Sequence, residues 1–240
     1  MIDKGRALRQ LGEEIDRYHH VLVDADFAAP VEPCPGWAVQ DLNAHMGVVH
    51  RWATGIVRSG ERASFDGEPE PGRDAGIAWF DEGAAALLEL LAVTDLEMPC
   101  WGFGSGGTAE FWFRRQLQEI FVHRIDLEEA TSKPGPRSSE IASDGIDEVL
   151  EVFVNRMAGR GKGPALPAPI SFECTDAEGA WTLAPDLSFT REATASAKLA
   201  GGAVPLLLLL WNRIDLNDPR IAHTGDPSAI DALRTGQLVP

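Results

Sequence analysis

The feature that most constrains this chain is a change in hydrophobic spacing about two thirds of the way along. Up to about residue 131, apolar residues recur three or four positions apart, as they do on one face of an α-helix, in segments near 2–26, 39–59, 75–93 and 109–131. The segment PISFECTD, residues 169–176, alternates instead with a period of two, which is typical of a β-strand. The spacing therefore predicts an α+β chain with an all-helical N-terminal half.

This division predicts two domains. Helices of similar length joined by loops favour a four-helix bundle over residues 1–140, and the remaining residues, 141–240, form a smaller α/β domain. Both halves are long enough to bury a core of their own. Further strands are expected at 180–186 and 194–199, and helices at 140–158, 203–211 and 230–238.

The charge balance limits the partners of this chain. It carries 37 acidic against 21 basic residues, a formal net charge of −16. Such a surface repels nucleic acids and anionic membranes, so we expect neither as a partner. An acidic substrate would have to be held by local arginines, because the overall field opposes it.

Cysteine content and apolar run lengths indicate a cellular setting. Only Cys34, Cys100 and Cys174 are present, and no CxxC occurs, which argues against a disulfide framework and a thiolate zinc site. The longest apolar run, residues 203–211, is far shorter than the roughly 20 residues that span a bilayer. The N-terminus has a helical pattern rather than that of a signal peptide. We expect a soluble, cytoplasmic protein.

One helical segment raises a chemical question. In QEIFVHRIDLEEA, residues 118–130, Glu119 and His123 are four residues apart and share one helical face. Such a pair is either a surface hydrogen bond or two ligands of a metal ion. The second interpretation needs a third ligand from another segment.

His45 is the candidate third ligand. It follows Leu42 by three residues and precedes Val49 by four, so it points along the apolar stripe of its helix. A polar side chain there costs several kcal/mol unless it is paired or binds a metal. His45, Glu119 and His123 together offer two imidazoles and a carboxylate, which suit zinc or another divalent ion and leave positions open for catalysis. The alternative is a solvated Glu–His pair and a hydrogen-bonded core histidine, and we expect His50 to face a loop or solvent.

Two motif segments carry a family resemblance. PVEPCPGWAVQDLNAHMGVVHRWA (31–54) and EIFVHRIDLEEA (119–130) resemble the mycothiol-dependent maleylpyruvate isomerase family of actinobacteria, part of the wider DinB-like metal-dependent four-helix bundles. The matching features are a PGW turn before a DLxxH helix, an ExxxHR helix and a C-terminal LLLLLWNR segment. In that family the histidine of DLxxH and both residues of ExxxH bind the metal, which implies His45, Glu119 and His123 here. The resemblance also implies a sterol-carrier-like α/β C-terminal domain.

The resemblance further implies a reaction. A thiol co-substrate, mycothiol, would be ionised at the metal and would add to a small electrophile such as maleylpyruvate, in an isomerase or an S-transferase. Arg124, which follows His123, and Arg213, in LLLLLWNR, are the candidates for holding a substrate carboxylate. A metal-dependent hydrolase and a non-catalytic small-ligand-binding protein remain alternatives, and the chain is a monomer or a homodimer.

Overall fold

The computed structural model describes residues 3–70, 72–103 and 107–240. The chain divides into two compact units, the first reaching Pro136 and the second beginning at Arg137. The α+β class predicted from the hydrophobic spacing is confirmed. In the described residues, no helix combines the length and the apolar character needed to cross a membrane.

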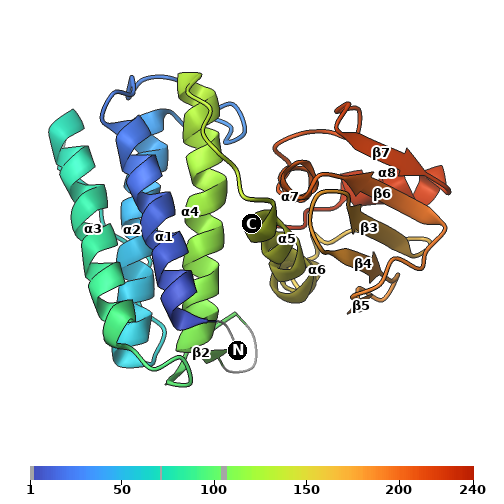
Figure 1. Cartoon of the computed structure of the whole chain (residues 1–240), viewed down its shortest axis with the longest axis horizontal. Helices are drawn as coiled ribbons and strands as arrows, with labels where there is room; N and C mark the ends of the chain where they lie inside the picture. Colours follow the sequence, from blue (N-terminus) through green and yellow to red (C-terminus); the bar gives the residue numbers. More distant parts are fainter. Residues whose placement is uncertain (1–2, 71, 104–106) are drawn as a thin grey trace. The chain divides into compact units, whose positions relative to one another are not determined.

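The N-terminal unit is built on four long helices, which run side by side in Figure 1. They are α1 (Lys4–Leu22), α2 (Val39–Ser59), α3 (Arg73–Val93) and α4 (Ala109–Thr131). Helix α1 packs mainly on α4, and α2 packs on both α3 and α4. A short antiparallel pair, β1 (Pro99–Cys100) and β2 (Gly107–Thr108), precedes α4. The contact between α2 and α4 is the one that positions the candidate site.

Local sequence accounts for the helix ends. The Asp3 carboxylate accepts a hydrogen bond from the Arg6 backbone N–H at 2.7 Å and so caps α1. Helix α2 ends at Gly60, whose φ of 75° is a left-handed conformation that glycine adopts without strain. Helix α1 therefore begins, and helix α2 ends, where residue chemistry favours it.

Two glycines allow α2 and α3 to approach closely. A Cβ added at Gly47 would lie 2.1 Å from the Trp79 side chain, and one at Gly83 would lie 3.2 Å from the Gly47 carbonyl oxygen. The Arg51 guanidinium stacks over the Trp79 ring at 3.5 Å and donates to the Trp79 carbonyl oxygen. This tight seam holds α3 against α2.

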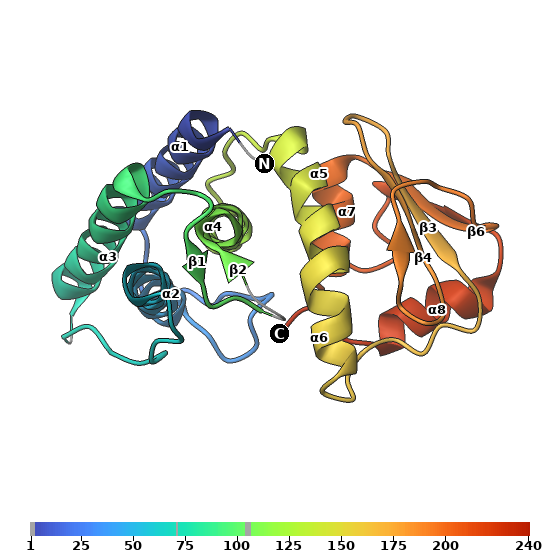
Figure 2. The same ribbon diagram turned by 90° about the horizontal axis from the view of Figure 1, so that it is seen from below.

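The C-terminal unit contains a five-stranded mixed sheet of order β5-β4-β3-β6-β7. Strand β3 pairs in parallel with β6, whereas the other neighbours are antiparallel. Helix α7, an apolar segment, packs on β3 and β6 and lies beside α5 (Figure 2). The strands are β3 (Ile170–Cys174), β4 (Ala180–Leu183), β5 (Phe189–Thr190), β6 (Ala197–Gly201) and β7 (Ile221–Thr224). The helices are α5 (Ser139–Glu148), a π-helical turn (Val149–Phe153), α6 (Val154–Ala158), α7 (Ala203–Leu210) and α8 (Pro227–Thr235).

Candidate metal centre

The structure brings together the three residues predicted as metal ligands. His45 extends from α2, and Glu119 and His123 extend from one face of α4. The Glu119 Oε1 atom lies 3.2 Å from His45 Nε2 and 3.4 Å from His123 Nε2. One donor atom from each residue lies within 4.8 Å of the other two.

The cluster is partly open to solvent. The side chains of His45, Glu119 and His123 are 22%, 15% and 6% exposed. The two imidazole rings meet edge to face, with centroids 5.1 Å apart. Solvent can therefore reach this cluster, and His45 is its most exposed member.

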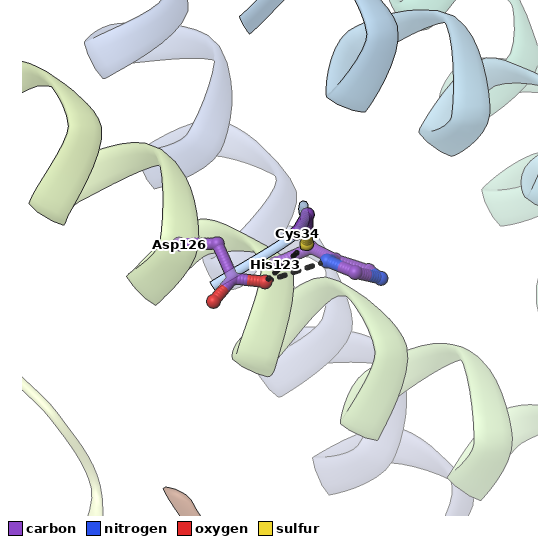
Figure 3. A group of neighbouring side chains, drawn as sticks. All are labelled: Cys34, His123 and Asp126. Atoms are coloured by element: carbon purple, nitrogen blue, oxygen red, sulfur yellow. Dashed lines mark hydrogen bonds and ion pairs between the residues drawn. The ribbon is translucent and has the colours of Figure 1, made fainter. Parts of the chain in front are cut away.

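Asp126 supports His123 from behind the cluster. This carboxylate is fully buried, and its Oδ2 atom lies 2.9 Å from His123 Nδ1 (Figure 3). With the proton on Nδ1, the imidazole donates to Asp126 and presents Nε2 to Glu119. A carboxylate behind a ligating histidine is the usual outer partner of protein metal sites, because it fixes the ring and raises its basicity. Asp126 was not predicted as a site residue, although it follows His123 by three residues on the same helix.

A second donor set shares His123. The Cys34 Sγ atom, from the loop before α2, lies 3.8 Å from Asp126 Oδ2, and Cys34, His123 and Asp126 also have donor atoms within 4.8 Å of one another. In that set the Asp126 carboxylate already accepts hydrogen bonds from His123 Nδ1 and Cys34 Sγ. We therefore favour the set built on His45, Glu119 and His123 Nε2.

Electrostatics prepare Glu119 and His123 differently. Burial alone would raise the pKa of Glu119, but the Arg115 guanidinium at 2.7 Å and hydrogen bonds from both histidines hold that pKa well below its usual range. Burial would lower the pKa of His123, but hydrogen bonds to Asp126 and Glu119 raise it to about 9. Glu119 is thus a carboxylate at neutral pH, and an arriving cation must displace a proton from His123.

The donor set fits a divalent cation. Two imidazole nitrogens and one carboxylate are ligands that zinc accepts, and a three-residue set leaves positions for water or substrate. The outer carboxylate of Asp126 completes the pattern.

Arg124 does not face this cluster, so its predicted role in holding substrate is corrected. Its guanidinium is fully buried and donates to Glu14 of α1 at 2.5 Å and to Glu128 of α4. A third donor reaches the Pro136 carbonyl oxygen at 3.0 Å. These contacts occupy the guanidinium inside the unit, because α1 packs on that side of α4.

Arg213 lies in the C-terminal unit, just after α7. Its guanidinium donates to the Trp211 carbonyl oxygen at 3.0 Å, and it lines a cavity of about 450 Å³ together with Asn212 and Leu216. Its predicted contact with substrate stays a prediction.

His50 is buried, contrary to the expectation that it faces a loop or solvent. Its Nδ1 atom lies 3.0 Å from the Gln116 Oε1 atom, and burial lowers its pKa to about 4. It joins α2 to α4 as a neutral core residue.

Aromatic side chains border the open side of His45. The Trp37 ring centroid lies 5.1 Å and the Phe65 centroid 6.1 Å from that of the imidazole. Trp37 is held in a tight loop, where Val31 N–H donates to the Trp37 carbonyl oxygen at 2.9 Å and Gly36 has a φ of 84°. The PGW sequence thus supplies both a left-handed turn residue and a ring beside the ligand.

Comparison with known families decides where the chain belongs. Residues 8–128 match the model described as the mycothiol maleylpyruvate isomerase N-terminal domain, and residues 140–232 match the corresponding MDMPI C-terminal domain. The chain belongs to the mycothiol maleylpyruvate isomerase family. The two motif segments had predicted this membership.

Solved structures of that name share the fold. Two crystal structures of mycothiol-dependent maleylpyruvate isomerase, one of a histidine-to-alanine mutant, align with TM-scores of 0.63 and, for the mutant, 0.64. In each case the aligned sequences are 12% identical, and the alignment covers 95% of this chain and 96% of the isomerase chain. None of the curated proteins matches the sequence.

Proposed function

We propose that this protein is a metal-dependent enzyme that uses mycothiol to isomerise or conjugate a small electrophile. The observation that carries the proposal is the convergence of His45, Glu119 and His123 on a partly open face of the N-terminal unit. Membership of the mycothiol maleylpyruvate isomerase family, over both units, supports the identity of the thiol. Within the proposal the ion is zinc, the compartment is the cytoplasm, and the partners are a small thiol and a small substrate.

The chain's own residues would prepare the site. Glu119 is kept ionised by Arg115, and His123 is oriented through Nδ1 by Asp126. A divalent ion bound there would lower the pKa of a coordinated thiol, so that it is a thiolate near neutral pH. Trp37 places an apolar ring beside His45, with the two ring centroids 5.1 Å apart.

The protein's cysteines favour an added thiol. Burial raises the pKa of Cys100, and burial together with Asp176 raises the pKa of Cys174 to about 11. Cys34 donates its S–H to Asp126. Neither Cys100 nor Cys174 is ionised at neutral pH, so a nucleophilic thiolate is best supplied by a co-substrate.

Two reactions fit such a thiolate. In an isomerisation, sulfur adds to a conjugated carbon–carbon double bond, rotation follows about the resulting single bond, and elimination releases the same thiolate with the trans product. In a transfer, sulfur displaces a leaving group and stays attached.

The test combines metal analysis with thiol dependence. We expect about one divalent ion per chain, and turnover of a cis-unsaturated keto acid or another electrophile only when mycothiol is added. His45→Ala should weaken metal affinity at least about 100-fold, because even an outer-shell partner is worth 10–100-fold. His19→Ala is the matched control, since His19 pairs with Asp81 at 2.7 Å on the surface.

Other outcomes would redirect the proposal. Turnover without thiol would favour a hydrolase, and tight binding of an apolar ligand without turnover would favour a binding protein. If the His45→Ala variant kept its full metal content, His45 would not be a ligand and the proposed metal site would be wrong.

A further inference from the structure

An aromatic wall adjoins the candidate metal centre. We define it by Trp37, Phe65 and Trp52, which come from the loop before α2, the segment after α2 and α2 itself. Trp37 and Phe65 both neighbour the His45 ring, and Phe65 meets Trp52 edge to face at 5.2 Å. The wall therefore starts at a candidate metal ligand and leads away from it.

The wall extends into further aromatic rings. Trp52 lies 5.8 Å from both Trp101 and Phe103, measured between ring centroids. Phe65 itself is 53% exposed, and only Val93 is another strongly exposed large hydrophobic residue among those the structure describes. Leaving an aromatic ring in water beside a reactive site is unfavourable unless another apolar group covers it during function.

The charges around Phe65 disfavour an anionic occupant. The segment ERASFDGEPE, residues 61–70, which contains Phe65, carries four exposed acidic residues and a single base, Arg62, whose guanidinium lies 5.6 Å from the Trp101 ring centroid. The arginines of α4 that flank the ligand pair in sequence, Arg115 and Arg124, both donate to carboxylates of the protein. A dicarboxylate beside Phe65 would meet like charge, whereas a neutral ring would meet aromatic faces.

We infer that the substrate of this site is a planar, uncharged aromatic electrophile, with the aromatic wall as its binding surface and Phe65 and Trp37 as the residues that set specificity. This inference rests on the proposed thiol-dependent function and narrows its substrate class. In the reaction, the thiolate sulfur bonds to an electrophilic ring carbon, the bond from that carbon to its leaving group breaks, and the leaving group departs as an anion. The thiol proton passes to solvent, and no oxidant or reductant is needed.

The experiment compares two electrophiles with mycothiol and the metal-loaded protein. 1-Chloro-2,4-dinitrobenzene, which releases chloride, represents the aromatic class, and maleate represents the dicarboxylates. We expect a higher kcat/KM for the aromatic probe. Phe65→Ala should lower that value about 2- to 10-fold, the range expected for one lost aromatic pair, mainly through KM. Phe65→Tyr should retain it, and Val93→Ala should change nothing.

A binding measurement separates this inference from the proposed function. Quenching of tryptophan fluorescence by S-(2,4-dinitrophenyl) mycothiol should be saturable and should weaken about 2- to 10-fold in Phe65→Ala at unchanged metal content. Preference for maleate, or binding insensitive to both Phe65→Ala and Trp37→Ala, would overturn the aromatic assignment while leaving thiol dependence intact. Saturable binding without any thiol-dependent turnover would support the aromatic wall as a binding surface. It would also show that the proposed thiol-dependent reaction is wrong.

Discussion

Two charged clusters on consecutive residues of α4 have opposite surroundings. His123 joins His45 and Glu119 in a cluster that solvent can reach, whereas Arg124 joins Glu14 and Glu128 in a cluster that is almost completely buried. The difference arises because neighbouring helical residues point about 100° apart, toward α2 in one case and toward α1 in the other.

The comparison separates a structural from a chemical use of charge. In the Arg124 cluster each of the three guanidinium nitrogens donates to a protein oxygen, so each is already engaged inside the unit. In the His123 cluster two imidazole nitrogens and one carboxylate converge on a common region, where Glu119 Oε1 lies 3.2 Å from His45 Nε2 and 3.4 Å from His123 Nε2. The His123 cluster is the candidate site because its donor groups are partly exposed and converge on one region, and not simply because it is charged.

The largest expected effect is on the buried cluster. Arg124→Met should lower the free energy of unfolding by about 3–5 kcal/mol, because it removes the buried guanidinium that Glu14 and Glu128 share. The partly exposed Arg17, which pairs with Glu14 at 2.5 Å, remains in the variant. Chemical denaturation measures this loss. Lys133→Met, which breaks the exposed pair with Asp24, is the control and should cost about 0–1 kcal/mol.

A second measurement on that variant sharpens the comparison. The folded Arg124→Met protein should bind metal as tightly as the parent, since Arg124 contributes no group to the site. A selective loss of metal at unchanged stability would mean that the two clusters are not separate.

An intermediate effect is expected from pH in metal-free protein. The folded pKa of His123, about 9, lies above its ordinary value of 6.5. Its contribution to stability is therefore fully present below pH 6.5 and is lost as pH rises through 9, a change on the order of 3 kcal/mol. The difference in unfolding free energy between the parent and His123→Asn, both treated with chelator, should shrink over that range. If the difference stayed constant from pH 6 to 10, His123 would not have a pKa near 9 in the folded protein.

The smallest effect concerns Asp126. Asp126→Asn should weaken metal binding about 10- to 100-fold, because the amide lacks the charge that fixes His123 and raises its basicity. Competition with a chromophoric chelator measures the affinity. Asp74→Asn, at a side chain that is 98% exposed, is the matched control and should bind as the parent does. Equal affinities in the two variants would show that His123 needs no outer carboxylate.

The helices could be predicted from sequence because their apolar stripes are long. The segments expected at 39–59 and 109–131 coincide with α2 and α4, and the strand expected at 169–176 contains β3. Strand β5, at two residues, is too short for alternation to appear, and the mostly exposed strand β7 was not expected. Pattern is informative only where an element is long enough to repeat it.

The errors at individual residues have a common physical origin. The burial of Arg124 depends on Glu14, which is 110 residues away, and that of His50 depends on Gln116, which is 66 residues away. No local spacing reveals such partners, because they exist only after helices pack. His45, in contrast, lies on an apolar stripe, which gave a local reason to expect it inside the bundle.

The candidate centre joins segments that are distant along the chain. His45 and Glu119 are 74 residues apart, whereas Glu119 and His123 are separated by a single helical turn. The α4 pair can therefore form as soon as that helix does, but the complete donor set requires closure of a long loop and its entropic cost. An ion that prefers the complete set would select conformations in which α2 and α4 are already docked, and would act as a reversible cross-link between the two halves of the bundle.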